Sequence, residues 1–514
     1  MKPLYSLFLT FGLVVLIPAC EKEIRQEEQF HAFVPANIDP SAGNWATVHL
    51  TAPNQIAVPP PAPVNSDSYQ AELEAIKDAQ QKLTAQQHEI IRFWSGTGVL
   101  RWNQIMRELV AQFNLPPAPL PDGTYPVPDP ENPFSDPRFP FANPPYAARA
   151  YSYVSTAMYD ALIATWHYKF LYNRPAPYEV DDGIKAFVPQ TDLPSYPSEE
   201  AVMSGVATEL LKALFPAAVE KITRWAADQR NAALWSGKAT PSDISAGLAL
   251  GKAVAAIFMI RARADGMSAA AGNKAQWEAL KLNATSRGDV AWVSLDIPPR
   301  PPMLPFFGNV LPWKMTHDDI VALRPPPPPL ADSEEMKAEL NEVKQFLKNS
   351  TRERLRIVHF WADGAGTYTP PGHWNDIAAE YIAEAQFSEV RSARAFALLN
   401  MALHNAAVAC WETKYFYFNP RPSQLDPSVK TLTGIPNFPS YTSGHSTFSG
   451  AAATILSYLF PAHQSKFNDM AKEASMSRLY GGIHYRKDCE VGLDHGKQIG
   501  NFLLDNFART DGAD

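Results

Sequence analysis

The sequence predicts an all-α protein made of two duplicated helical bundles, and three observations lead to that prediction. Apolar residues recur at spacings of three and four from about Tyr69 to the C-terminus, as on amphipathic helices, while strand-like alternation is scarce. Two proline-rich segments, 116–145 and 297–329, interrupt this pattern. Because proline lacks the helix donor and holds the chain extended, we interpret both as connectors. Finally, separated segments of the chain repeat one another.

The repeat has a single offset. Three separated segments of the second half follow their first-half counterparts by 245 residues: 394–414 after 149–169, 442–450 after 197–205, and 479–497 after 234–252. Farther upstream, 360–377 resembles 93–105 with a five-residue insertion. One offset shared by separated segments is difficult to obtain by chance, so the two bundles are expected to derive from a duplication.

The first twenty residues predict export. Lys2 precedes an uncharged stretch, 3–19, that ends at Cys20, which is typical of a secretory signal rather than a spanning helix. Residues 16–20, LIPAC, resemble the lipobox of bacterial lipoproteins. By that resemblance Cys20 becomes the lipidated first residue of the mature chain, anchored to a membrane in the periplasm or at the cell surface. A plain cleaved signal and an uncleaved anchor are the alternatives.

The cysteine count and the net charge exclude other classes. Only Cys410 and Cys489 follow Cys20, so no disulfide framework supports the fold, and free buried thiols are favoured over a single bridge between them. The net charge of −8 argues against nucleic acid as a general partner, because phosphate backbones require a basic face. An anionic ligand must therefore be bound by a local cluster of cations.

Such a cluster lies near the C-terminal end. Lys414 and Arg421 flank a helix end that is followed by proline. Arg478 and His484 are separated by a segment with two glycines, which predicts a turn that lets both side chains converge. Lys414 and Arg421 alone would be solvated surface charges. Together, arginine forks and a lysine point charge match the oxygens of an oxyanion.

Between these cations, Ser443-Gly444-His445 opens an apolar helical run. Ser443 is a candidate N-cap, and Gly444 permits close approach to the backbone. The free amides and the dipole of a helix N-terminus favour an anion, beside which His445 would lie. On its own, this tripeptide predicts only an ordinary cap with an exposed histidine.

The repeat provides an internal control. Residues present in both halves are expected to serve the scaffold: Trp166 with Trp411, Gly205 with Gly450, Asp243 with Asp488, Gly247 with Gly492, and Leu248 with Leu493. Residues confined to the second half are candidates for chemistry: Gly444, His445, Arg478 and His484 correspond to Glu199, Glu200, Ala233 and Ala239. Two carboxylates at the position of the anion would repel it, so only the second half is expected to hold an intact site. Lys169 and Arg174 resemble Lys414 and Arg421, which lowers the specificity of those two cations.

Two carboxylates are candidate partners of the histidines. Asp488 follows His484 by four residues, so on a helix it would orient the imidazole, although its first-half counterpart equally favours a scaffold role. Asp363, in the segment FWADG, is replaced by Ser95-Gly96 in the first half. We expect Asp363 to pair with Arg478 or to hold His445, and a helix-ending role is the plain alternative.

Other candidates are weaker. His404 lies in an apolar helix and is expected to be a hydrogen-bonded core residue, while His373 lies in a Pro-Gly segment and is only a candidate for the mouth of the site. A divalent metal site is disfavoured because the cluster is cationic and lacks paired carboxylates. A hydrolase with Ser443 as nucleophile is disfavoured because the GxSxG context is missing.

In order along the chain, these residues form a signature: Lys414 and Arg421-Pro422, Ser443-Gly444-His445, then Ser477-Arg478, His484 and Asp488. It resembles the signature shared by vanadium-dependent haloperoxidases and type 2 phosphatidic acid phosphatases, the PAP2 superfamily. Thr442 stands where phosphatases commonly have proline, which leaves every anion-contacting position filled. The chain length, the two bundles with one intact site, the FWADG segment and the proline-rich crossover are similar to the bacterial haloperoxidase-like branch.

The resemblance implies roles for these residues. Vanadate would be held by Lys414, Arg421, Ser443, the Gly444 amide and Arg478, with a ring nitrogen of His484 bound to the metal. His445 would be the acid–base group, and Phe438 would lie on the halide side, as in the chloroperoxidase type. Hydrogen peroxide and a halide would be converted to hypohalous acid.

Two other functions stay open. In a PAP2-type acid phosphatase, with no vanadate, His484 would attack the phosphorus of a phosphate ester and His445 would protonate the leaving group. A non-catalytic oxyanion-binding lipoprotein would need only the cations, so the two histidines argue against it.

These observations together predict five regions. They are a lipoprotein signal peptide at 1–20, a tether and extended lead-in at 21–66, a degenerate N-terminal helical bundle at 67–290, a proline-rich crossover at 291–332, and a C-terminal catalytic helical bundle at 333–514.

Overall fold

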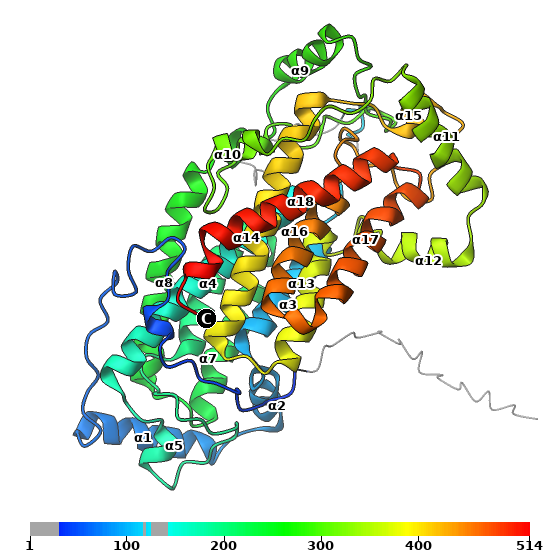
Figure 1. Cartoon of the computed structure of the whole chain (residues 1–514). Helices are drawn as coiled ribbons and strands as arrows, with labels where there is room; N and C mark the ends of the chain where they lie inside the picture. Colours follow the sequence, from blue (N-terminus) through cyan, green and yellow to red (C-terminus); the bar gives the residue numbers. More distant parts are fainter. Residues whose placement is uncertain (1–29, 117–119, 125–141, 514) are drawn as a thin grey trace, which may run out of the picture.

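The computed structural model describes residues 30–116, 120–124 and 142–513. Within these ranges the regular structure is helical, with no strand, which confirms the predicted all-α class. The body is elongated, with α9 (Lys274–Ser286) at one end and α1 (Asp67–Gln80) and α5 (Pro177–Val180) at the other (Figure 1). Cys20 lies outside the described residues.

The duplication is visible in the helix boundaries. Four helices of the first half begin and end 245 residues before their partners: α4 (Pro144–Tyr172) and α14 (Glu389–Tyr417), α5 and α15 (Pro422–Leu425), α6 (Glu199–Leu214) and α16 (Gly444–Leu459), α7 (Val219–Trp235) and α17 (Gln464–Tyr480). A fifth pair, α8 (Pro241–Ala264) and α18 (Arg486–Asn506), shares the offset at its start. Upstream, α2 (Ala85–Trp94) and α3 (Gly98–Phe113) precede α4 as α12 (Arg352–Phe360) and α13 (Thr369–Glu384) precede α14.

The remaining helices are short or peripheral. They are α10 (His317–Ala322), α11 (Glu334–Lys348) and the 3-10 helices Ala42–Asn44, Pro216–Ala218, Met267–Ala269, Phe307–Asn309, Pro461–His463 and Ala508–Thr510.

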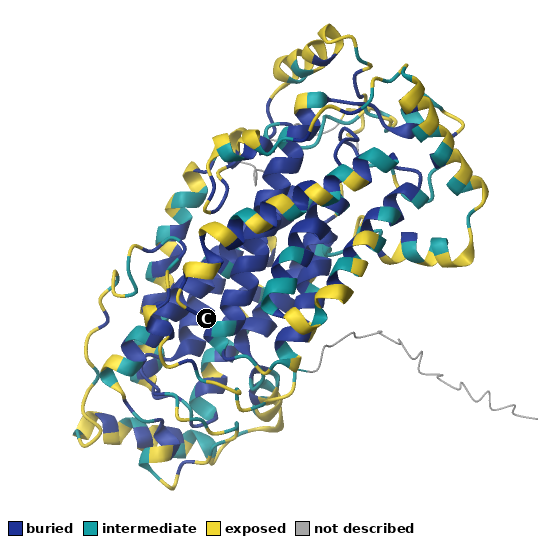
Figure 2. Cartoon of the chain, in the orientation of Figure 1, coloured by how far each residue is buried: buried dark blue, intermediate teal, exposed yellow. Residues whose placement is uncertain are grey.

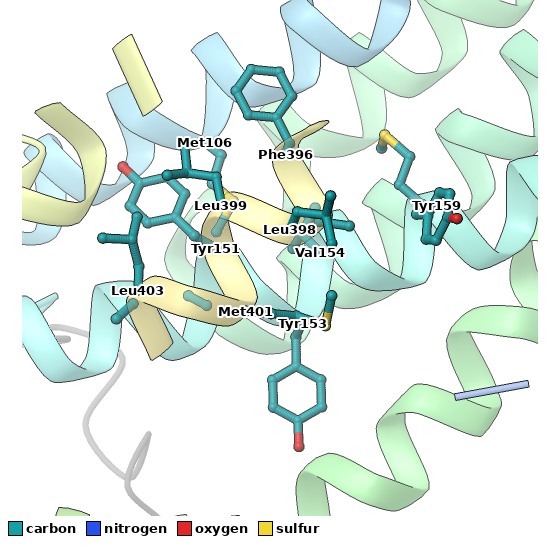
Figure 3. Close-up of a cluster of buried hydrophobic side chains, with 14 of the residues drawn as sticks. Met106, Tyr151, Tyr153, Val154, Tyr159, Phe396, Leu398, Leu399, Met401 and Leu403 are labelled. Atoms are coloured by element: carbon teal, nitrogen blue, oxygen red, sulfur yellow. The ribbon is translucent and has the colours of Figure 1, made fainter. Parts of the chain in front are cut away.

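The two halves share one hydrophobic core, in which α4 and α14 pack along each other and are buried over most of their lengths (Figure 2). Side chains of α3, α4 and α14 form a continuous cluster there, drawn in Figure 3: Met106, Tyr151, Tyr153, Val154, Tyr159, Phe396, Leu398, Leu399, Met401 and Leu403. Because both helices are apolar on all sides, each can serve as the central helix of its own bundle and as the partner of the other.

The glycines shared by both halves are packing residues, as predicted. A Cβ atom at Gly450 would lie 2.2 Å from the Leu493 carbonyl oxygen, and one at Gly492 would lie 2.9 Å from the Ser443 carbonyl oxygen. In the first half, a Cβ at Gly247 would lie 2.3 Å from the Ser198 carbonyl oxygen. Only glycine permits this close approach, so it fixes α16 against α18 and α6 against α8.

The described part of the lead-in, from residue 30 to α1, packs on both halves. Three consecutive backbone amides, those of Val48, His49 and Leu50, donate to the buried carboxylate of Asp160 in α4 at 2.6–2.8 Å. The Asp39 carboxylate accepts from Ser388 Oγ at 2.6 Å and pairs with Arg391 at the start of α14. Composition alone predicted an extended segment here, and it did not reveal these contacts.

One stretch, Pro241–Ala269, is long and apolar enough to cross a membrane by length and composition alone, and 39% of its apolar window is buried. It comprises α8, which packs along α6 as α18 packs along α16. A Cβ at Gly251 would lie 2.3 Å from the Val202 carbonyl oxygen, so the contact between α8 and α6 is close.

Candidate oxyanion site

Lys414 lies in the last turn of α14, where its side chain is fully buried. Its Nζ donates to the carbonyl oxygens of Pro439 and Ser440 at 2.8 and 2.7 Å. Burial, together with the nearby Arg421, lowers the pKa of Lys414 to about 7. An anion in contact with Nζ would raise this pKa again.

Two buried guanidinium groups complete the set of cations. Arg421 donates to the carbonyl oxygens of Phe438 at 2.9 Å and Ile483 at 2.7 Å. Arg478, in the last turn of α17, donates to Ser477 Oγ at 2.8 Å and to the Val358 carbonyl oxygen at 2.9 Å. Burial lowers the pKa of each arginine to about 10, so both stay charged at neutral pH. Backbone carbonyls thus hold the guanidinium groups in place.

None of these three cations contacts a carboxylate within 4.0 Å among the residues that the structure describes. Burying a charge without a counter-ion is costly, and folded proteins normally pair such groups. Three buried cations that lie close together without carboxylate partners are typical of a site that binds an anion. The carboxylates of Asp488 and Asp363 act on Arg421 and Arg478 respectively from a greater distance.

His484 is oriented by Asp488. The imidazole Nδ1 lies 2.9 Å from Asp488 Oδ2. Because an ionised carboxylate only accepts hydrogen bonds, Nδ1 carries the proton. Nε2 keeps its lone pair and accepts from Arg421 Nη1 at 3.4 Å. Burial, with Arg421 and Lys414, holds the pKa of His484 well below its usual range. The neutral ring can therefore act as a ligand or nucleophile through Nε2.

Asp488 serves the scaffold as well as the site. It is the third residue of α18, and the backbone amide of Tyr485 donates to it at 3.3 Å. Burial raises the pKa of Asp488 to about 6. Asp488 therefore has both roles that the sequence suggested. It caps α18 as Asp243 caps α8, and its carboxylate also contacts His484.

Ser440 is a site residue that sequence reasoning missed. Its hydroxyl donates to Asp488 Oδ2 and lies 3.3 Å from His484 Nδ1. Its first-half counterpart, Ser195, likewise contacts Asp243 Oδ1 at 3.3 Å. Because a serine is present at this position in both halves, the comparison between halves gave no reason to single it out.

The N-terminus of α16 faces the site as predicted. Ser443 is its N-cap, with Oγ accepting from the Ser446 amide at 3.4 Å, and Gly444 is the first helical residue. A Cβ added at Gly444 would meet nothing closer than 3.9 Å. Packing therefore does not require glycine here, in contrast to Gly450, and the space that a side chain would occupy is open.

His445 and Asp363 come together at one side of the site. His445 Nε2 lies 3.7 Å from Asp363 Oδ2 and has no hydrogen-bond partner within the described part of the chain. Burial, with Arg478 and His373, holds the pKa of His445 well below its usual range. Of the two partners predicted for Asp363, the carboxylate lies against His445 and makes no ion pair with Arg478. It also contacts His373, at 3.0 Å, a residue that the sequence favoured only weakly.

Phe438 lies against the cations. Its ring centre is 5.1 Å from Lys414 Nζ, 5.0 Å from Arg421 Cζ and 5.0 Å from the ring of Trp411. The side chain is 8% exposed, so it forms an apolar wall of the site. The Trp411 indole donates to the carbonyl oxygen of Met303, which brings the proline-rich crossover next to this wall.

The first half carries its own carboxylate where the second half leaves space. Glu199, the counterpart of Gly444, lies 2.7 Å from Lys169 and 2.6 Å from Lys238. Although burial alone would raise it, the two ammonium groups lower the pKa of Glu199 to about 2. The sequence predicted that carboxylates in the first half would repel an anion. The structure shows a more specific reason for the loss of the site: the Glu199 carboxylate itself neutralises the two lysines.

Arg174 is not the structural counterpart of Arg421, although the sequence suggested a resemblance. At the offset of 245, Arg421 corresponds to Ala176 and Arg174 to Asn419. Arg174 pairs with Asp243 and donates to Thr240 and Ser242. Arg421 is therefore particular to the second half, like Arg478.

Two further predictions are confirmed. His404 is a buried core residue whose Nε2 lies 3.1 Å from the Leu311 carbonyl oxygen. Cys410 and Cys489 are both free and buried.

Comparisons with known proteins agree with this geometry. The profile of the PAP2 superfamily matches residues 394–507, the segment that holds Lys414 through Asp488. No curated protein matches the chain at a significant level.

Among solved structures, a bacterial vanadium-dependent iodoperoxidase superposes with a TM-score of 0.57 at 23% identity, covering 79% of this chain and 95% of that one. Holo and apo forms of a bacterial vanadium-dependent chloroperoxidase are more distant, each at 14% identity, with TM-scores of 0.49 and 0.48. They cover 75% and 72% of this chain and 96% and 95% of theirs. The profile match supports the PAP2 resemblance inferred from the signature, and the superposition on the iodoperoxidase shows a shared fold that extends over both halves.

Proposed function

We propose that the protein is a vanadate-dependent haloperoxidase, which oxidises a halide with hydrogen peroxide to hypohalous acid. The observation that carries the proposal is a group of three buried cations that have no carboxylate partner among the described residues. They lie around His484, whose unprotonated Nε2 is 3.4 Å from Arg421. These groups suit a tetrahedral oxyanion that also accepts a nitrogen ligand.

The residues present fit vanadate. Lys414, Arg421 and Arg478 would hold its charged oxygens, with Ser443 and the Gly444 amide, and the lone pair on His484 Nε2 would bind the metal. When bound, vanadate supplies the Lewis-acid centre at which peroxide is activated. The side chains keep the positive charge fixed throughout turnover, so no reorganisation is needed as negative charge develops.

His445 is the group that we propose moves protons. Its ring is neutral because burial and Arg478 disfavour the charged form, and its Nε2 faces Asp363. A neutral imidazole can accept a proton from hydrogen peroxide, and the carboxylate beside it stabilises the resulting cation. Phe438 would keep water from the halide side of the pocket.

A PAP2-type acid phosphatase is the second candidate, favoured by the profile match to the catalytic segment. The same cations would stabilise the transition state of phosphoryl transfer, with His484 Nε2 as nucleophile. The haloperoxidase is preferred because the likeness to the iodoperoxidase extends over both bundles and not only over the matched segment.

The deciding experiment compares the purified protein with and without orthovanadate. Iodide, bromide and chloride are each supplied with hydrogen peroxide, and p-nitrophenyl phosphate is tested in parallel. Halide oxidation that depends on vanadate supports the proposal. Phosphate release without halide oxidation would establish the phosphatase instead, and vanadate binding with neither activity would indicate a non-catalytic oxyanion-binding protein.

A further inference from the structure

The Asp363 carboxylate is shared between two imidazoles. Oδ1 lies 3.0 Å from His373 Nδ1, and Oδ2 lies 3.7 Å from His445 Nε2. The side chains of Asp363 and His373 are 6% and 7% exposed, so water does not screen their contact. The mechanism above uses His445 and Asp363 but gives His373 no part.

The ring of His373 is fixed by aromatic neighbours. It stacks on the Trp361 indole, with ring centres 4.4 Å apart and an angle of 24° between planes, and meets the edge of Phe360 at 4.9 Å. Its position in the first turns of α13 fixes the backbone as well. These contacts fix the orientation of the ring, so that Nδ1 points at the Asp363 carboxylate.

Asp363 itself has little local support. It follows α12 in a loop, with a backbone φ of 45°, in the left-handed region that aspartate tolerates better than most residues. Among the described residues, the side-chain hydrogen bonds of its carboxylate are to His373. The orientation of Oδ2 toward His445 therefore depends on the His373 donor.

The first half supports this assignment. His373 corresponds to Arg101, whose guanidinium donates to the Phe93 carbonyl oxygen and stacks on the Phe93 ring at 4.3 Å. Asp363 corresponds to Ser95-Gly96. The half without a catalytic histidine thus lacks both the carboxylate and the imidazole behind it, although an aromatic contact is kept at the same place.

We propose that His373 is a positioning residue for the acid–base step: it donates Nδ1–H to Asp363 Oδ1 and so holds Oδ2 toward His445 Nε2. The proposal rests on the role of His445 proposed above. The carboxylate accepts from His373 and faces His445 Nε2 at 3.7 Å, so the donor on His373 fixes the plane of the carboxylate that the His445 ring meets.

Two substitutions separate the hydrogen bond from the packing. His373→Asn keeps a donor near the Nδ1 position but removes the stacked ring, while His373→Phe keeps a ring against Trp361 but removes the donor. His359→Ala, at an exposed histidine of the neighbouring α12, is the matched control. Thermal unfolding of each variant checks that it folds.

The first readout uses no vanadate, peroxide or halide. The ¹⁵N shifts of the His445 imidazole, which report its tautomer and hydrogen bonding, are expected to change in His373→Phe and to stay as in the wild type in His373→Asn and His359→Ala. The second readout is turnover: His373→Phe should lower kcat about tenfold with KM for peroxide unchanged, and His373→Asn should restore most of it.

The opposite pattern, with His373→Phe like the wild type and His373→Asn impaired, would show a purely packing role and overturn the proposal. Unchanged His445 shifts in both variants would overturn it too. The ¹⁵N shifts are measured without cofactor, so they test the role of His373 independently of turnover. A protein that oxidises no halide would refute the proposed function, and the shifts would still decide whether His373 positions Asp363.

Discussion

Lys169 and Lys414 occupy equivalent positions in the two halves, yet among the described residues only Lys169 contacts a carboxylate. Lys169 Nζ lies 2.7 Å from Glu199 Oε2, whereas Lys414 Nζ donates to the carbonyl oxygens of Pro439 and Ser440. A carboxylate of the same chain thus neutralises Lys169, whereas Lys414 is open to an external anion. This difference explains why two bundles with the same fold form one candidate anion site.

Removing the internal anion should destabilise the protein. Glu199→Ala leaves the buried Lys169 without a counter-ion, while Lys238 keeps its ion pair with Glu200. We therefore expect a loss of about 3 kcal/mol in the free energy of unfolding, measured by urea titration. Sulfate at millimolar concentration should restore part of this stability by replacing the carboxylate. Glu209→Ala, half-exposed on the same helix, should change stability by less than about 0.5 kcal/mol. Equal stability of Glu199→Ala and the wild type would contradict the account of the first half.

Anion binding in the second half should weaken as the pH rises through about 7. The free protein has the pKa of Lys414 lowered to about 7, and a bound anion raises it, so binding takes up a proton above that pH. Sulfate is a suitable probe because its own charge is constant from pH 6 to 9. Calorimetric titrations across that range should show falling affinity in the wild type and a flatter, weaker profile in Lys414→Met. A constant wild-type affinity would show that Lys414 stays charged in the free site.

Asp488→Ala should reduce kcat by roughly 10- to 100-fold, because His484 loses the acceptor that fixes its tautomer and direction. The loss of the helix cap adds a stability cost of about 1 kcal/mol. Asp243→Ala is the control in the other half: it removes the equivalent cap and also the ion pair with Arg174, so it should lower the unfolding temperature at least as much while leaving kcat unchanged. If both variants lose turnover in proportion to stability, Asp488 acts only on the scaffold.

His484→Ala should abolish turnover by either proposed mechanism, since Nε2 is the group that binds vanadium or attacks phosphorus. Glu200→Ala, in the other half, should leave turnover nearly intact. Steady-state assays with iodide and with p-nitrophenyl phosphate test both variants. Loss of activity in Glu200→Ala would contradict the proposal that the second half alone carries the active site.

We propose that Cys20 carries the lipid anchor. Cys20→Ser should therefore abolish incorporation of labelled fatty acid in a bacterial host and release the protein from the membrane fraction. The test is metabolic labelling followed by fractionation. Retained label in Cys20→Ser would refute the assignment.

The sequence predicted the helical class, the duplication and the cation cluster because each leaves a local signal. Helix periodicity follows from burial of one face, and a repeated offset survives wherever glycines such as Gly450 and Gly492 must keep two backbones in contact. The cations Arg421 and Arg478 were recognisable because they stand in one order along the chain with Lys414, Ser443-Gly444-His445 and His484.

The sequence did not reveal contacts that join distant segments. Ser440 contacts Asp488 across 48 residues, and it escaped notice because both halves keep a serine there. His373 reaches Asp363 only because α13 folds back on the loop after α12. That Glu199 pairs with lysines rather than merely repelling an anion required the position of Lys238, whose counterpart in the second half, Ile483, is uncharged.

The contacts of the lead-in have a mechanical consequence. Asp39 is bound to Ser388 and Arg391 at the start of α14, and Asp160 in α4 receives three amides from residues 48–50. Any pull on the N-terminus is therefore borne first by the two central helices of the body and not by α1. A force applied through a membrane tether would act along the helix whose far end carries Lys414.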